Sequence, residues 1–469
     1  MKSIKPLFIY NSLTRKKEQF TPLKPREVNI YTCGVTVYDA SHIGHARSLF
    51  IFDLIRRYLK YRKFKVKFVR NITDIDDKII NRALELKVDW RDLVEKYINS
   101  YYEDLVSLGI DRGDYEPRAT ENISEMIAYI GMLIQKGYAY QAKGDVYFNV
   151  RRFNDYGRLS GQGVDEMYKG VRIEPNELKK DPLDFALWKQ SKENEPYWDS
   201  PWGRGRPGWH IECSVMSQKF LKTTTLDIHA GGRDLIFPHH ENEIAQSQAF
   251  SGKPFAKYWI HHGLLTMNGQ KMSKSSGNFI TIRDFLIKYK DPDLLKLFFL
   301  TAHYSHPIDY TDGKIEEARA AKERIIIFLN KARQAKVRFS FFHMKCAKLR
   351  ELRLKFIEKM DDDFNTPEAL ACIFEMVNLG NKNLNNPYIL KEVREDVLKA
   401  SGLLGLSLQV AESTDSLDDK TIDRKIIERN SARKARDYAL SDKIRKELEE
   451  KGVILEDLKD GTTGWRRKL

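Results

Sequence analysis

The sequence predicts an α/β fold built on a parallel sheet, interrupted by an inserted segment and followed by a helical region. Three observations support this fold class. A β-rich stretch, a helical stretch and a second β-rich stretch follow one another within about 45 residues near the N-terminus. Glycine, proline and tryptophan then become frequent over a long central segment, and the last third carries mostly helical patterns.

The first β-rich stretch is Glu27–Thr32 and the second is Lys65–Val69. Between them, apolar side chains recur at helical spacing from Leu49 to Leu59. A strand, a crossover helix and a second strand of this combined length predict two parallel strands in one sheet.

Composition changes mark the other boundaries. Residues 133–225 are expected to form an insertion of short strands and loops, which divides the sheet domain into a first half, 1–132, and a second half, 226–290. Beyond them the sequence predicts a helical region over 291–408, a polar acidic linker over 409–420 and a small basic domain over 421–469.

The overall composition excludes several classes of protein. The chain has 469 residues, of which 42% are hydrophobic, so it can bury large cores and is not a disordered chain. No apolar run approaches the roughly 18–20 residues that a membrane span needs, so we expect no membrane association. Four cysteines without a Cys-x-x-Cys pair indicate a reducing compartment, and the cytoplasm is expected.

The chain is basic, with 80 Lys and Arg against 66 Asp and Glu, a net charge of +14. This excess favours a polyanionic partner, although a solvated basic surface explains it equally well.

Histidine is distributed unevenly. Six of the eleven histidines lie between His210 and His262, where an even distribution would place about one. Histidines that only pack in a core do not usually gather in this way, so the segment is a candidate functional site.

Two more histidines, His42 and His45, stand three residues apart at the start of the first predicted helix. Ser41 is predicted to cap that helix, whose free N–H groups would attract an anion such as a phosphate. Gly44 lacks a Cβ and would let a flat base or ribose approach. A capped helix with two surface histidines is the alternative interpretation.

A loop at 269–277 brackets Lys271 and Lys274 with glycines and serines. Such a loop can close and bring two ammonium groups to a polyphosphate. By itself the segment could equally be a flexible surface loop.

Taken together, these motifs carry a specific resemblance. His42–His45 and Lys271–Ser275 match, letter for letter and in order, the two signature motifs of class I aminoacyl-tRNA synthetases. Within that class the chain resembles cysteinyl-tRNA synthetases over nearly its full length, most clearly in the segments Tyr31–Asp39, Val69–Lys78, Pro207–Ser214, Phe237–Glu243 and Gly461–Arg467.

The resemblance implies a Rossmann-like catalytic domain, an acceptor-stem contact region with a helical bundle over 291–408, and an anticodon-binding domain over 421–469. It implies that cysteine is activated with ATP, accompanied by Mg²⁺, and then transferred to tRNA(Cys). A monomer is expected. The residues leave two other interpretations open, a ligase that passes the same adenylate to a small amine and a non-catalytic tRNA-binding paralogue.

The resemblance also implies one Zn²⁺ per chain. Spacing alone does not establish a metal site, because the two candidate cysteines are 180 residues apart and could be buried thiols. In the family the metal is held by two Cys, one His and one Glu, which fall on Cys33, Cys213, His239 and Glu243. The metal would select a thiol over a hydroxyl, a discrimination that shape alone supplies poorly. Cys346 and Cys372 match no ligand position and are interpreted as packing residues.

The remaining residue roles also follow from the resemblance. His42 and His45 are expected to bind the triphosphate, and Lys271 and Lys274 the leaving pyrophosphate. Gly44, Gly232 and Asp234 are expected to line the adenosine pocket. Thr73, Asp74 and Trp209 are expected to line the amino-acid pocket. Contacts with tRNA are expected from Arg433, Arg436, Trp465 and Arg466. Trp209 and Trp465 could equally be core residues.

Overall fold

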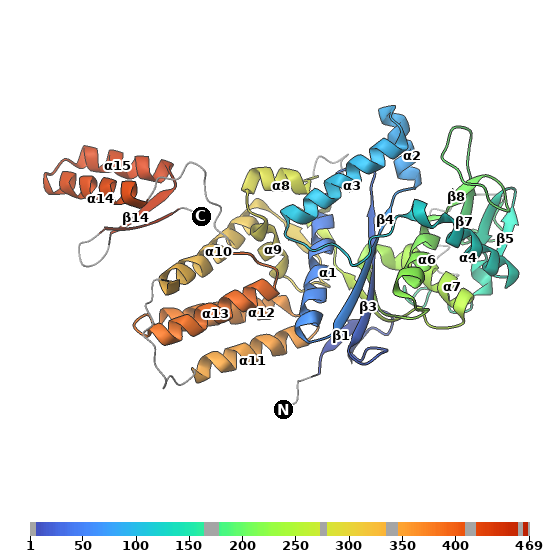
Figure 1. Ribbon diagram of the computed structural model, residues 1–469, viewed down its shortest axis with the longest axis horizontal. Coiled ribbons are helices and arrows are strands. Elements are labelled where there is room, and N and C mark those ends of the chain that lie inside the picture. Colours follow the sequence, from blue (N-terminus) through green and yellow to red (C-terminus); the bar gives the residue numbers. More distant parts are fainter. Residues whose placement is uncertain are drawn as a thin grey trace. The chain divides into compact units, whose positions relative to one another are not determined.

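The computed structural model describes residues 6–163, 178–272, 279–333, 346–408, 419–457 and 463–467. The chain divides into two compact units, 1–407 and 408–469, which are described separately (Figure 1). Among the described residues, none of the helices combines the length and the apolar character that crossing a membrane requires.

The first unit is organised around a four-stranded sheet in which every neighbouring pair is parallel, in the order β10-β9-β3-β4. Its strands are β3 Glu27–Thr36, β4 Lys65–Thr73, β9 Leu226–Gly232 and β10 Ala256–His262. Every residue of β9 is buried, as expected for a central strand covered on both faces. The predicted α/β fold with a parallel sheet is confirmed.

Helices cover both faces of this sheet. Figure 1 shows α1 on one side and α6 and α7 on the other. These helices are α1 Ile43–Tyr61, α6 Trp209–Leu221 and α7 Glu241–Ser251. The predicted crossover helix is therefore α1, which connects β3 to β4.

The central segment carries a separate antiparallel sheet in the order β5-β6-β7-β8. Its strands are β5 Ala139–Ala142, β6 Asp145–Phe148, β7 Phe185–Gln190 and β8 Gly205–Pro207. Within the range expected for the insertion, α6 packs against β4 and α7, so this helix joins the parallel sheet. Residues 164–177 lie outside the described residues.

The first unit also contains further helices, a hairpin and a small three-stranded sheet. They are the helices α2 Asp77–Leu86, α3 Trp90–Ser107 and α4 Ile123–Gln135, the short helices η1 Ala119–Asn122, η2 Val150–Arg152, η3 Arg233–Leu235 and η4 Ile236–His240, the hairpin β1 Phe8–Asn11 and β2 Lys16–Gln19, and the sheet of β11 Leu265–Met267, β12 Gln270–Lys271 and β13 Ile308–Tyr310.

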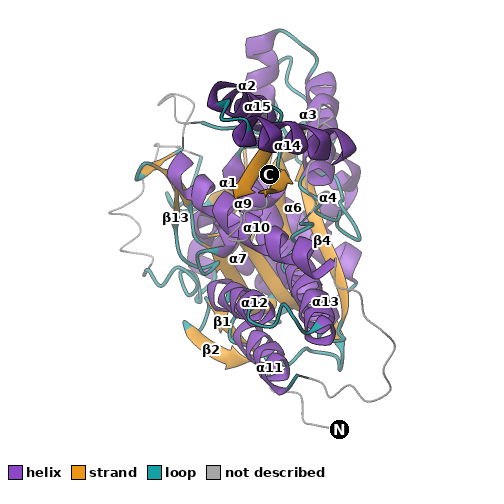
Figure 2. Cartoon of the chain, turned by 90° about the vertical axis from the view of Figure 1, so that its left-hand side faces the viewer, coloured by secondary structure: helices purple, strands orange, loops and turns teal. Residues whose placement is uncertain are grey.

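The helical region predicted after Asp291 is present. Its helices are α9 Pro292–Leu300, α10 Asp312–Arg333, α11 Ala347–Asp361, α12 Thr366–Asn381 and α13 Pro387–Leu403, and α8 Ile282–Tyr289 precedes them. In Figures 1 and 2, α11, α12 and α13 lie side by side. The buried carboxylate of Asp293 pairs with Lys296 at 3.0 Å and with Lys322 at 3.4 Å, which ties α9 to α10.

The second unit has a small core of its own. It consists of α14 Asp419–Lys434, α15 Tyr438–Glu450, and the antiparallel pair β14 Val453–Asp457 and β15 Thr463–Arg467. The buried hydrophobic residues that form this core are Ile422, Ile426, Ile444, Leu448, Val453 and Leu455.

Arg47 links the start of α1 to two distant segments. Its guanidinium is fully buried and donates to the carbonyl oxygens of Gly263 at 2.7 Å, Leu264 at 2.8 Å, Tyr304 at 3.3 Å and His306 at 2.6 Å. Burial lowers the pKa of Arg47 to about 10, so it remains charged at neutral pH. Arg47 therefore fixes α1 against the chain that leaves β10 and leads to β11.

Replacing Arg47 with methionine leaves four carbonyl oxygens without this donor in a buried place. We expect the Arg47→Met change to lower the free energy of unfolding by about 3–5 kcal/mol, measured by urea unfolding. The matched control is Lys348→Met, which removes only an exposed pair with Glu351 and should cost less than about 1 kcal/mol. Equal losses in the two variants would contradict the role given to Arg47.

Candidate active site

The candidate site lies at one edge of the parallel sheet, where the carboxyl ends of its strands meet. Cys33 lies near the end of β3, Thr73 ends β4, Gly232 ends β9 and His262 ends β10. In open parallel sheets this edge is where ligands bind. Side chains far apart in the sequence are therefore brought to one place.

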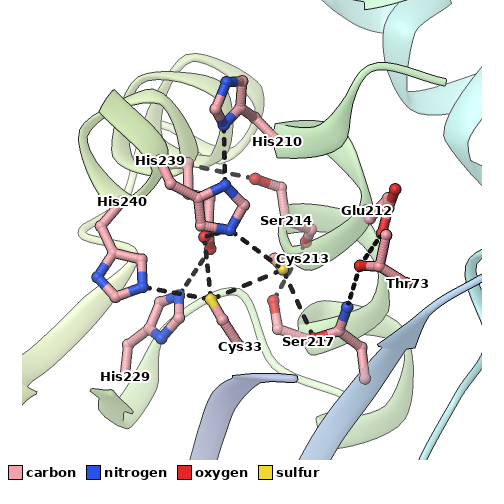
Figure 3. A network of polar contacts seen from close by, with 12 residues as sticks. Cys33, Thr73, His210, Glu212, Cys213, Ser214, Ser217, His229, His239 and His240 are labelled. Carbon is pink, nitrogen blue, oxygen red and sulfur yellow. Dashed lines mark hydrogen bonds and ion pairs between the residues drawn. The ribbon is translucent and has the colours of Figure 1, made fainter. Parts of the chain in front are cut away.

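Figure 3 shows the sulfur and histidine cluster at this edge. The Cys33 and Cys213 sulfurs are 3.8 Å apart, and the Cys213 sulfur is 3.6 Å from His239 Nε2. Glu243 Oε1 lies 2.9 Å from His239 Nε2 and 3.4 Å from the Cys33 sulfur. The four side chains that the resemblance implied as ligands thus converge. One ligand atom from each lies within 4.8 Å of the other three, and neither cysteine is in a disulfide.

This arrangement suits a tetrahedral metal ion. With bonds of about 2.0–2.3 Å, neighbouring ligand atoms of a tetrahedral Zn²⁺ lie about 3.3–3.8 Å apart, close to most distances in the cluster. An overlapping set replaces Cys213 and His239 with His229 and His240. The ligand atoms of that set also lie within 4.8 Å of one another, with His240 Nε2 3.2 Å from the Cys33 sulfur, and the family resemblance favours the first set.

The buried charges of the cluster stabilise one another. Burial alone would raise the pKa of the Cys213 thiol, but a hydrogen bond from Cys33 and the attraction of His239 outweigh it and bring the pKa to about 6. Burial likewise opposes the charged form of His239, but Glu243 and Cys213 raise its pKa to about 10. Burial opposes the anionic form of Glu243 as well, and His229 and His239 still hold its pKa well below its usual range. The lowered pKa of Cys213 favours the thiolate, the form that binds metal, whereas His239 has to release a proton before its Nε2 can bind one.

Second contacts orient three of the four candidate ligands, Glu243, His239 and Cys33. His229 Nε2 lies 2.6 Å from Glu243 Oε2, and His210 Nδ1 lies 2.9 Å from His239 Nδ1. His240 Nε2 lies 3.2 Å from the Cys33 sulfur. The sequence showed this histidine cluster but gave no role to these three members, because their partners come from separate elements.

The start of α1 differs from the prediction in one respect. His42, not Ser41, is the N-cap, since His42 Nδ1 accepts the Gly44 N–H at 3.0 Å. His45 Nδ1 in turn accepts the His42 N–H at 3.2 Å. The backbone of Ser41 is instead paired with the chain before α8, where its carbonyl accepts the Ile282 N–H at 2.9 Å.

These cap bonds fix the hydrogen positions on both imidazoles. Because each Nδ1 accepts a backbone N–H, the proton of each neutral ring is on Nε2, which is left to donate. Burial lowers the pKa of His42 to about 4, and burial with the neighbouring His42 and Lys78 lowers the pKa of His45 to about 3. The two rings stack at 3.8 Å between centroids. The helix start therefore presents two neutral N–H donors.

The same helix start is contacted by Met272, within the second signature motif, and by Phe279 and Ile280, which follow that motif. A Cβ on Gly44 would lie 3.0 Å from Met272 Cε, so the two segments are in contact. Beyond the loop, Phe279 packs edge-on against His42 at 5.3 Å, and the Ile43 N–H donates to the Ile280 carbonyl at 3.1 Å. Lys274 and the side chain of Lys271 lie outside the described residues.

The expected adenosine-pocket residues lie beside these histidines. Gly232 precedes Asp234, an exposed carboxylate whose charge acts on His42. A Cβ on Gly232 would lie 2.4 Å from Asp234 Oδ1, so a side chain there would displace that carboxylate.

The expected amino-acid pocket residues divide into two groups. Trp209 stacks on His239 at 4.1 Å, and Thr73 Oγ1 donates to Glu212 Oε2 at 2.8 Å, so both adjoin the sulfur cluster. Asp74 accepts from the Thr120 N–H at 2.9 Å and from its hydroxyl, so its carboxylate is bound to η1, and its expected place in the amino-acid pocket stays a prediction.

In the second unit, Arg433 and Arg436 are exposed. Trp465 Nε1 donates to Asp423 at 2.9 Å, and the ring packs against the small core. Trp465 is half-buried, and its expected contact with tRNA stays a prediction. The side chain of Arg466 lies outside the described residues.

Comparisons with known proteins agree with this site. Residues 19–320 match the family described as the tRNA synthetases class I (C) catalytic domain, and residues 355–409 match the DALR domain. A cysteine–tRNA ligase of Anoxybacillus flavithermus is 50% identical over 98% of this chain and 99% of its own length. One from Geobacillus sp. is 48% identical, again over 98% of this chain and 99% of its own length.

Among solved structures, methionyl-tRNA synthetase from Mycobacterium tuberculosis, in complex with methionyl-adenylate, aligns with a TM-score of 0.62. The alignment covers 81% of this chain and 91% of that one at 14% identity, which supports the fold alone.

The depressed pKa of His42 predicts a pH dependence of stability. An unfolded histidine titrates near 6.5 and the folded one near 4, so between pH 7.5 and 5 only the unfolded chain binds this proton. Stability therefore falls as the pH falls. His42→Asn removes this titration and keeps a cap acceptor. Between pH 7.5 and pH 5 the free energy of unfolding of this variant should therefore fall by about 2 kcal/mol less than that of the wild type. Urea unfolding at the two pH values measures this, and parallel pH dependences would contradict it.

Proposed function

Because the chain belongs to the cysteine–tRNA ligase family, we propose that it activates L-cysteine with ATP and transfers the cysteinyl group to the 3′-terminal adenosine of tRNA(Cys). The observation that carries this proposal is the position of a thiolate-bearing cluster and of two neutral N–H donors at one edge of the same sheet. The DALR match and the near-complete coverage of the relatives favour tRNA over a small amine as the acceptor.

The substrate is the nucleophile in both steps, so the chain needs to position and to stabilise charge. In the proposed first step the carboxylate of cysteine attacks the α-phosphate of ATP and pyrophosphate leaves. His42 and His45 donate their Nε2 hydrogens to phosphate oxygens as charge develops. Their low pKa values keep these donors neutral over the physiological range.

Lys271 and Lys274 are proposed to stabilise the leaving pyrophosphate, with Mg²⁺ bound to the nucleotide. Support comes from the contacts of Met272 and Phe279 with the start of α1, because the loop between them is anchored at both ends beside the histidines. Gly44, Gly232 and Asp234 are proposed to receive the adenosine, with Asp234 on the ribose hydroxyls.

Cys33, Cys213, His239 and Glu243 are proposed to hold one Zn²⁺. When bound, zinc supplies a soft Lewis acid that prefers the thiolate of cysteine to the hydroxyl of serine. The chain's own part is to keep Cys213 deprotonated and to aim His239 and Glu243 through His210 and His229. Thr73 and Trp209 are proposed to line the amino-acid pocket beside these ligands.

The second unit is proposed to bind the anticodon arm, with Arg433, Arg436 and Arg466 contacting phosphates. A monomer in the cytoplasm is also proposed. The four cysteines, which include no Cys-x-x-Cys pair, support the location alone.

ATP–pyrophosphate exchange with each of the twenty amino acids tests the function. We expect exchange with cysteine only, and its loss after zinc chelation with recovery when zinc is returned. Exchange with another amino acid would keep the reaction class and reject the substrate, and no exchange would reject an activating enzyme.

Cys213→Ser tests the proposed metal site. A serine hydroxyl is not ionised at neutral pH and binds zinc poorly, so this variant should lose zinc and the preference for cysteine over serine together. Cys372→Ser is the matched control, since Cys372 lies in the helical region, and it should retain full zinc content by metal analysis. Full zinc occupancy in Cys213→Ser would contradict the ligand assignment.

A further inference from the structure

Tyr304 joins two parts of the first unit, one through its side chain and the other through its backbone. Its hydroxyl donates to Asp363 Oδ1 at 2.8 Å, in the connection between α11 and α12. Its carbonyl oxygen accepts the Gly263 N–H at 2.9 Å and a hydrogen of Arg47 Nη2 at 3.3 Å. The side chains of Tyr304 and Asp363 are both buried. One residue therefore connects the helical region with α1 and with the chain that follows β10.

Asp363 is itself held in place by contacts with two other segments. Its Oδ1 also accepts the Tyr10 N–H at 2.9 Å, and its own N–H donates to the Phe8 carbonyl oxygen at 3.0 Å, so it is tied to β1. His303 Nε2 donates to the Asp363 carbonyl oxygen at 2.9 Å. The carboxylate thus offers a fixed acceptor to the Tyr304 hydroxyl.

The backbone of this connection adopts an unusual conformation. Asp363 and Phe364 have φ values of 61° and 53°, in the left-handed region that a bulky residue such as phenylalanine seldom adopts. The Phe364 ring is fully buried and packs against Tyr58 at 6.0 Å and against Tyr304 at 6.3 Å. Such conformations persist only where the surrounding contacts enforce them, and they gather at functional sites. The connection between α11 and α12 is therefore a candidate functional element.

From Tyr304, one path leads to the start of α1. Arg47 is two residues after His45, and it donates to the carbonyl oxygens of Tyr304 and His306. A shift of this backbone would move the acceptors of Arg47 and, with them, the first turns of α1. Because the cap of that helix fixes the imidazoles of His42 and His45, their Nε2 donors would move as well.

A second path leads to the strand that begins the lysine-containing loop. β13 begins four residues after Tyr304 and pairs in parallel with β11. β11 pairs in turn with β12, where Thr266 stands opposite Lys271. Tyr304 thus lies at the base of both segments that are proposed to bind the phosphates of ATP.

We propose that Tyr304, anchored by Asp363, is a positioning residue for the activation of cysteine, and this inference rests on the proposed function. It acts through Arg47 and through the backbone that leads to β13, and so sets the place of both phosphate-binding segments. The sulfur cluster draws its four proposed ligands from other elements, β3, α6, η4 and α7. Loss of the Tyr304 hydroxyl should therefore slow the reaction with ATP without weakening the binding of cysteine.

The test is Tyr304→Phe, which keeps the ring and removes only the hydroxyl. Cysteine-dependent ATP–pyrophosphate exchange is measured on the zinc-loaded full chain. Rates are expressed per cysteine-binding site counted by calorimetry, so unfolded protein does not contribute. We expect kcat to fall about tenfold while the dissociation constant of cysteine stays within about twofold of the wild-type value, because only donors used in the transition state are displaced. A merely structural defect would lower the number of binding sites and leave kcat per site unchanged.

Tyr58→Phe is the matched control, because the Tyr58 hydroxyl also donates to a buried aspartate beside the same connection, Asp361, at 2.6 Å. Tyr58 lies in the last turn of α1, at the opposite end of the helix from His42 and His45. This variant should keep kcat within about twofold of the wild-type value. An unchanged kcat in Tyr304→Phe, an equal loss of kcat in both variants, or a parallel loss of cysteine affinity would overturn the proposal.

Two replacements of Asp363 give the same comparison if Tyr304→Phe does not fold. Asp363→Gly removes the acceptor, and glycine adopts the left-handed backbone readily, so kcat should fall as in Tyr304→Phe. Asp363→Asn keeps an acceptor oxygen and also tolerates this backbone, so it should retain the wild-type kcat. Equal kcat values in these two variants would count against the proposal. Failure of the proposed function would appear separately, as wild-type protein without cysteine-dependent pyrophosphate exchange.

Discussion

Parallel pairing of β3 with β4 and β9 is the constraint on which the site depends. The pairing places the ends of three chain segments, separated by up to about 200 residues, at one edge of the sheet. The approach is closest at Gly34, where a Cβ would lie only 1.5 Å from the Asn71 carbonyl oxygen. Asn71 Oδ1 also accepts the Gly34 N–H at 2.8 Å, so the strand that carries Cys33 is held against the strand that carries Thr73.

The buried charges at this edge depend on one another. Glu243 is stabilised as an anion by His229 and His239, and His239 in turn is stabilised as a cation by Glu243 and Cys213. Removing one member leaves its partners buried and unpaired, which costs several kcal/mol. The stabilities of the buried charges in the cluster are therefore coupled.

Much of this could be predicted from the sequence because the signals are local. The periodicity between Leu49 and Leu59 gave the crossover helix, and the signature motifs led to the histidines and lysines. What could not be predicted depends on distant contacts. Ser41 is the better intrinsic cap, but its backbone pairs with the chain before α8, and the cap shifts to His42. The contacts of His210, His229 and Glu212 likewise join elements that are far apart in the sequence, which no spacing rule reveals.

The cap at His42 also constrains how the protein can be engineered. Asparagine, aspartate or serine satisfies the first turn of a helix as well as histidine does, so a library sorted for thermal stability would accept these replacements. Each would remove an imidazole donor while leaving the helix intact. Variants chosen for folding stability alone would therefore include well-folded proteins that lack one of the two imidazoles proposed to bind phosphate at the start of α1.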